Sequence, residues 1–119
     1  MGMRMSKPWV ELTPETISAL PAQLGVYEVS QDRSATPDGP KTHRIGFAGG
    51  TEPFGMRTAL ERERDDGATF FRHEFTHAYM TRGQELLMIF EADHGRLPPG
   101  NQRPAKLGRL SPLGIERAS

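Results

Sequence analysis

Residues 73–77 read His-Glu-Phe-Thr-His, which is the H-E-x-x-H spacing of a zinc-binding motif. On an α-helix, two histidines four residues apart point the same way and can bind one Zn²⁺, while the glutamate between them acts as the general base of a metallopeptidase. The candidates for a third ligand are Glu85, Glu91 and His94, and none of them is distinguished by its position in the sequence. The motif makes a zinc metallopeptidase one hypothesis for the chain.

The residues around this motif, from 68 to 80, also alternate in character. Aromatic or histidine side chains occupy every second position, at Phe71, His73, Phe75, His77 and Tyr79. This period of two, with many Phe, Tyr and Thr residues, is typical of a β-strand. In a strand His73 and His77 would lie about 13 Å apart, at roughly 3.3 Å per residue, which is too far for one metal ion. We therefore predict a strand here and rank the peptidase second.

Two further apolar runs predict the strands that accompany it. Residues 25–30 and residues 43–48 each alternate aromatic or β-branched side chains with other residues. The segment between them, residues 31–42, is rich in Asp, Ser, Pro and Gly, which is typical of a long, mobile hairpin loop. We expect the three strands to form a small antiparallel sheet.

Helices are predicted before and after these strands. Thr13 has the residue type of an N-cap and Pro14 that of a first helical position, and Pro21 ends this short helix. Residues 82–94 carry an apolar stripe with Gly95 directly after it, where a C-terminal glycine is common. The sequence therefore predicts helices flanking the sheet.

A third helix is predicted over residues 54–64, between the second and third strands. Three charged neighbours on it are expected to form a solvated stripe: Glu61, Arg62 and Glu63. Taken together, these elements predict an α/β chain of the α+β type, with a three-stranded antiparallel sheet flanked by helices.

The length of 119 residues suits one domain, expected at 9–101, between a frayed start at 1–8 and a basic, loosely ordered tail at 102–119. The formal net charge is zero, so binding to nucleic acid would depend on a local patch. The absence of cysteine excludes disulfides and thiol nucleophiles. Neither a membrane span nor a signal peptide is predicted, so we expect a cytoplasmic protein without a membrane partner.

The order strand, loop, strand, helix, strand, helix resembles the GIY-YIG nuclease superfamily over about residues 22–101. Six short segments carry this resemblance: Gly25-Val26-Tyr27, Arg44-Ile45-Gly46, Phe54-Gly55-Met56-Arg57, Phe71-Arg72-His73-Glu74-Phe75-Thr76, Glu85-Leu86-Leu87-Met88-Ile89-Phe90 and Pro98-Pro99-Gly100-Asn101. Each segment is a weak signal by itself, and the set in this order is what makes the match. The resemblance implies a metal-dependent endonuclease that acts on nucleic-acid phosphodiesters.

The resemblance also implies roles for individual residues. Tyr27 would orient or activate the attacking water, and Arg57 would stabilise the negative charge that develops on the phosphate. Glu85 would bind Mg²⁺ or Mn²⁺. These roles require Tyr27, Arg57 and Glu85 to converge around one hollow the size of a phosphate. Nucleic acid, with DNA first, is the implied partner, and a homodimer or a partner protein could supply targeting.

Arg44 stands where the superfamily has its second tyrosine, and an arginine stays protonated and cannot act as a base. A nearby histidine could replace that tyrosine, and the choices are His43, His73 and His77; we predict His43 as a catalytic residue. Phosphate contacts are expected from Arg44, Arg72 and Asn101, and Asn101 could instead brace a strand end. A nucleic-acid-binding derivative without catalytic activity is therefore the main alternative.

Overall fold

The strand β2 (Gly25–Ser30) lies at the centre of the sheet, between β3 (Arg44–Ala48) and β4 (Phe70–Phe75). A two-residue strand, β1 (Val10–Glu11), pairs with the other side of β4, so the order is β1-β4-β2-β3 and every pairing is antiparallel. The computed structural model describes residues 3–34, 39–49 and 53–102. The three expected strands are confirmed, and β1 is a fourth that the sequence pattern did not predict.

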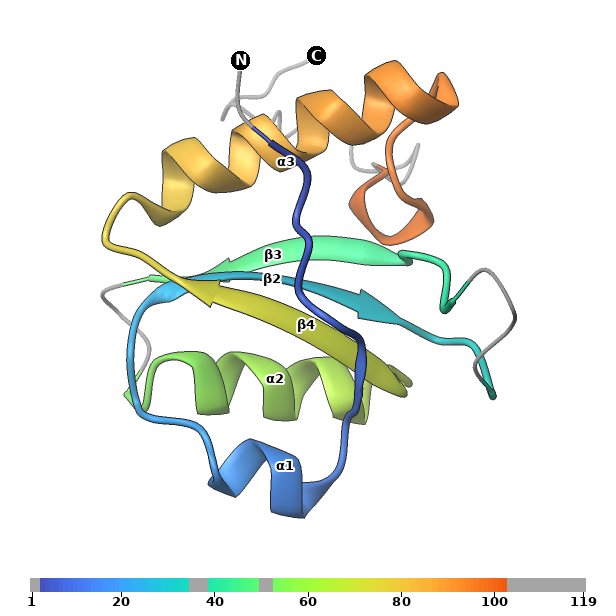
Figure 1. Ribbon diagram of the computed structural model, residues 1–119. Helices are drawn as coiled ribbons and strands as arrows, with labels where there is room; N and C mark the ends of the chain where they lie inside the picture. Colours follow the sequence, from blue (N-terminus) through green and yellow to red (C-terminus); the bar gives the residue numbers. More distant parts are fainter. Residues whose placement is uncertain (1–2, 35–38, 50–52, 103–119) are drawn as a thin grey trace, which may run out of the picture.

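Helices cover both faces of this sheet, which gives three layers (Figure 1). The helix α3 (Tyr79–His94) lies on one face, and α1 (Pro14–Ser18) and α2 (Met56–Asp65) lie on the other. A short 3₁₀ turn, η1 (Pro99–Asn101), packs against the edge strand β3. The α+β class is thereby confirmed. None of the described helices combines the length and the apolar character that crossing a lipid bilayer requires.

The H-E-x-x-H segment is extended rather than helical. Residues up to Phe75 belong to β4, and α3 begins only at Tyr79, so His77 lies in the connection between strand and helix. His73 sits within the strand between two aromatic rings, with ring centroids 5.6 Å from Phe71 and 4.8 Å from Phe75. The strand is confirmed for residues 70–75 but is shorter than the predicted 68–80, because Tyr79 and Met80 begin α3. The helical geometry that a zinc peptidase needs is absent from residues 73–77.

The helix ends follow local signals with small differences. The Thr13 side chain accepts a hydrogen bond from the backbone of Thr16, whose side chain bonds back to the N-cap, and Pro14 is the first residue of α1, as predicted. Gly95 ends α3 in the left-handed conformation with φ of 76°. The helix α3 begins at Tyr79, three residues before its predicted start at residue 82. The helix α2 begins at Met56, two residues after its own predicted start at residue 54.

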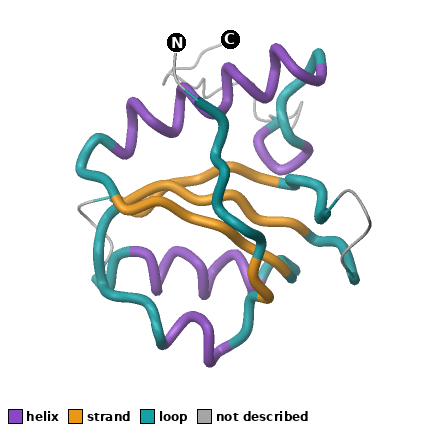
Figure 2. The backbone as a smooth tube through the Cα atoms, viewed as in Figure 1, coloured by secondary structure: helices purple, strands orange, loops and turns teal. Residues whose placement is uncertain are grey.

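Residues 3–9 form an extended segment that runs from beside α3 past the sheet to β1 (Figure 2). Met5 is only 3% exposed and packs in the apolar core below α3. The Arg4 side chain pairs with Asp93, and Arg82 donates a hydrogen bond to the carbonyl of Met3. These contacts differ from the expected frayed start, because a single buried methionine and two ion-pairing arginines tie the segment down.

Two apolar cores separate the layers, one on each face of β2. Tyr27 and Val29 point toward α1 and α2, and Val26 points toward α3 with Ile45 and Leu86. All six residues of β2 are buried. Alternate residues of this strand therefore belong to different cores. Expected site residues that lie on opposite faces of the sheet cannot meet.

Because β2 packs closely against β4 at Gly25, we expect a larger side chain at this position to destabilise the fold. A β-carbon added there would lie 2.1 Å from the carbonyl oxygen of Glu74, so the strands would have to separate. We expect Gly25→Ala to lower the free energy of unfolding by about 1–3 kcal/mol. At Gly83 in α3 the same change meets nothing closer than 3.6 Å, so Gly83→Ala should be neutral or stabilising. Urea denaturation of both variants checks this pair, and equal losses would contradict it.

Candidate functional site

The hydroxyl of Tyr27 is enclosed under α2. Tyr27 is 2% exposed and donates a hydrogen bond of 2.6 Å to Oε2 of Glu63. Burial, and then the negative charge of Glu63, raise the pKa of Tyr27 far above its usual range. A neutral phenol whose proton is already committed to a buried carboxylate is poorly suited to activate water.

Glu63 connects Tyr27 to Arg44, the residue that stands at the second tyrosine position of the GIY-YIG pattern. Arg44 Nε donates to the same Glu63 oxygen at 2.7 Å, and the side chain of Arg44 is 38% exposed while that of Glu63 is 9% exposed. The expected solvated stripe on α2 is thus wrong for Glu63. Charge patterning along the helix could not reveal this, because the two partners of Glu63 come from β2 and β3.

Arg57 lies on the same face of the sheet but takes part in a different contact. Its Nε donates a hydrogen bond of 2.6 Å to the carbonyl of Leu20, which ties α2 to the segment after α1. Arg57 also lines a hollow of about 410 Å³ between α1 and α2, whose lining does not include Tyr27. The other residues around this hollow are Pro14, Ile17, Ser18, Glu61, Arg64 and Asp65.

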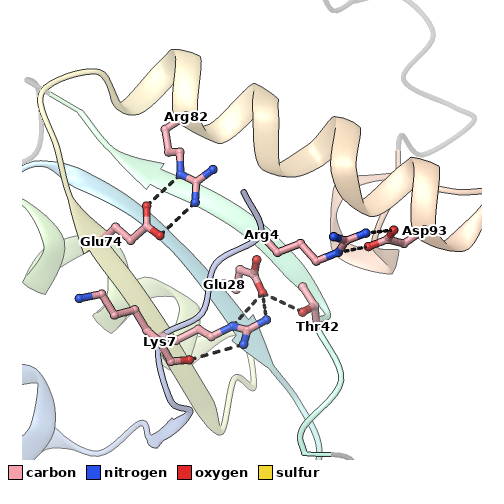
Figure 3. A network of polar contacts seen from close by, with 8 residues as sticks. Arg4, Lys7, Glu28, Thr42, Glu74, Arg82 and Asp93 are labelled. Carbon is pink, nitrogen blue, oxygen red and sulfur yellow. Dashed lines mark hydrogen bonds and ion pairs between the residues drawn. The ribbon is translucent and has the colours of Figure 1, made fainter. Parts of the chain in front are cut away.

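Glu85 lies on α3, across the sheet from Tyr27 and Arg57. Its Oε1 accepts a hydrogen bond of 2.6 Å from Arg82, which also binds Glu74 at 2.9 Å. Figure 3 shows the pair of Arg82 and Glu74, which joins α3 to β4. The expectation that Tyr27, Arg57 and Glu85 converge is therefore wrong, because the sheet separates them.

The surroundings of Glu85 do not fit the expected Mg²⁺ or Mn²⁺. The Arg82 guanidinium already lies between the carboxylates of Glu74 and Glu85, and a divalent cation would meet its positive charge there. Within the part of the chain that the structure describes, no three His, Asp or Glu side chains are grouped so that they could hold a metal ion.

Asn101 and His43 lie together at the edge strand β3. The Asn101 amide accepts from the backbone N–H of Ile45 and donates to the Ile45 carbonyl, both at 2.8 Å. The backbone N–H of Gly100 donates to the carbonyl of His43. Asn101 thus acts as the brace of a strand end, one of its two expected roles, and its side chain is committed to the backbone. His43 is half-buried beside this turn, directly before β3, and so is not part of the strand that carries Tyr27.

A cavity of about 680 Å³ lies on the α3 face, between the sheet, the loop before β3 and the C-terminal half of α3. Its apolar wall contains Met5, Leu86, Ile89 and Phe90. Its ionisable residues are mostly basic: Arg4, Lys41, Arg72, His94 and Arg96, with the acids Glu28 and Asp93. The volume is typical of sites that hold small ligands.

Glu28 is the buried charge of this cavity, and the half-buried Arg72 is its ion-pair partner. Arg72 donates to Glu28 Oε1 from Nε and from its terminal nitrogen, at 3.0 and 2.8 Å, and also bonds the carbonyl of Lys7. Its guanidinium lies 4.4 Å from the centre of the Trp9 ring. Arg72 was expected to bind phosphate; the structure places it in the cavity wall, paired with an acid. Glu28 was not among the expected site residues, because nothing in its local sequence marks it.

These features define a small α+β domain with a buried polar network on each face of its sheet. The chain belongs to the family described as domain of unknown function DUF7508, whose family model matches residues 3–93. The match includes the N-terminal segment that packs on α3 and stops before η1. No curated protein and no solved structure matches the chain significantly. Membership of the GIY-YIG superfamily stays a prediction.

The buried phenol predicts a loss of stability at alkaline pH. Because the folded pKa of Tyr27 lies above the ordinary value of 10.0, the unfolded chain releases this proton first as pH rises. The contribution of Tyr27 is therefore intact below about pH 9 and falls above about pH 10. We expect Tyr27→Phe to lose less stability than wild type when the pH is raised from about 9 to about 11, because only the wild-type chain has this buried phenol to lose. Denaturant unfolding at these two pH values measures the difference, and equal losses would refute the assignment.

Proposed function

We propose that the chain is a nucleic-acid-binding domain that does not hydrolyse phosphodiesters, and that the cavity under α3 is its binding site. The observation that supports this proposal most is the excess of basic side chains around that cavity. Lys41 and Arg96 are the central ones, because among the described residues neither side chain has an ion-pair partner. Cations without a partner beside a cavity are available for phosphate oxygens.

The arrangement of the motif residues supports binding rather than cleavage. The Tyr27 hydroxyl is committed to Glu63, and Arg57 and Glu85 lie on opposite faces of the sheet. The order of the elements still follows the nuclease resemblance, which is an analogy at the level of the fold and favours nucleic acid as the partner. Endonuclease activity stays a prediction of that resemblance. The peptidase hypothesis has no support from the extended 73–77 segment.

Because the formal net charge is zero, the proposed binding depends on the local basic residues. It is sensitive to salt because each phosphate contact releases counterions. DNA is the first polymer to test. We propose the cytoplasm as the compartment, because the chain has no cysteine, which fits a reducing environment. A homodimer or a partner protein would add affinity, because a single small site with few phosphate contacts binds weakly.

Removing the unpaired cations should weaken binding. We expect Lys41→Ala and Arg96→Ala each to lower the affinity for short labelled single-stranded DNA about two- to tenfold. Each change should also reduce the slope of log affinity against log salt by about 0.7 for the phosphate contact that it removes. Fluorescence anisotropy over a salt series measures both quantities. Arg64→Ala, on the face covered by α2, is the matched control and should change neither; an equal effect of the control would contradict this site.

A cleavage assay tests the second half of the proposal. Plasmid and single-stranded DNA incubated with the protein and Mg²⁺ or Mn²⁺ should stay intact, because the three expected catalytic side chains do not meet. Gel electrophoresis over a time course gives the result. Nicking by wild type that disappears in Glu85→Ala would show that the chain is a nuclease after all.

A further inference from the structure

One oxygen of Glu28 has no hydrogen-bond donor among the residues that the structure describes. The side chain is 7% exposed, and Thr42 and both Arg72 nitrogens donate to Oε1. No described residue donates to Oε2. Figure 3 shows the dashed lines meeting at one oxygen, while the other oxygen points toward α3. A buried carboxylate oxygen needs a hydrogen-bond donor, and Glu28 lines a cavity from which a bound ligand can supply one.

The walls around this acceptor suit a flat ring. Glu28 and the apolar side chains of Leu86, Ile89 and Phe90 line the same cavity, and the unpaired cations Lys41 and Arg96 line it as well. A ligand that fills this space needs an apolar face, an N–H group at one edge and a negative charge nearby. A nucleotide of a nucleic-acid strand has all three.

We propose that the cavity binds one unpaired base of a nucleic acid through an amino group that donates to Glu28 Oε2. This inference rests on the proposed function and adds its specificity. Cytosine, adenine and guanine carry such an amino group. Thymine and uracil do not, and their edge N–H lies between two carbonyl oxygens that a carboxylate repels. The base must be unpaired, because a duplex hides these edges from a cavity between a sheet and a helix.

The strand backbone then continues past the rim of the cavity. Lys41 and Arg96 line the same cavity as Glu28, so they are the cations available to the phosphate of the bound nucleotide, and such a contact positions the strand without reading its sequence. Arg72 and Thr42 hold the carboxylate in place and do not contact the base. Glu28 is therefore the residue that determines specificity.

The variant Glu28→Gln tests this geometry with almost no change in shape. Arg72 and Thr42 are donors here, so they retain the amide oxygen and turn the NH₂ group into the cavity. Wild type should bind oligo-dC and oligo-dA about tenfold more tightly than oligo-dT, as one hydrogen bond to a charged group allows. Glu28→Gln should reverse this order, because an amide donor prefers the thymine carbonyls. Anisotropy titrations of the three oligonucleotides measure both.

A second measurement leaves the protein unchanged, in case the variant fails to fold. Oligo-dC with two methyl groups on N4 cannot donate to Glu28 and should bind wild type about tenfold more weakly than oligo-dC. Equal binding of oligo-dC, oligo-dT and the methylated strand would overturn the base contact while leaving phosphate binding intact. If no oligonucleotide binds, the proposed function fails together with this inference.

Discussion

The structure depends on satisfying the polar groups of a strand that is buried on both faces. β2 lies between two strands and between two helical layers, yet it carries Tyr27, Glu28 and Ser30. Each polar group left without a partner would cost about 1–3 kcal/mol. Glu63 accepts the phenol on one side, and Arg72 and Thr42 donate to the carboxylate on the other. The positions of α2 and β4 are constrained by these bonds as well as by apolar packing.

The alternation of side chains along β2 divides these contacts between two faces. Tyr27 and Glu28 are neighbours in sequence, but one belongs to the α2 face and the other to the α3 face. Arg57 lies on the first face and Glu85 on the second. A site that required all of them could not form without breaking the sheet. The basic cavity with Glu28 at its base is, by contrast, built entirely on the α3 face, so its parts can act together.

The N-terminal segment has more importance than its composition suggests. Met5 completes the core below α3, and Arg4 contributes to the wall of the cavity while pairing with Asp93. Arg82 and Arg72 hold the backbone of this segment from helix and sheet. The family match begins at residue 3, so this packed segment is part of the family's domain. The cavity is thus assembled from both ends of the domain, which makes it a property of the whole fold.

The sequence by itself determined the local elements. Alternation predicted strands at residues 25–30 and within residues 68–80, Thr13 and Pro14 predicted the start of a helix, and Gly95 predicted the end of one, because these signals act over a few residues. Only the tertiary structure decided that Glu63 is buried, that Asn101 braces β3 and that Glu28 faces a cavity. The partners of these three side chains are 14 to 56 residues away in sequence. Short-range patterns cannot encode such distant contacts, because they arise only when the layers pack.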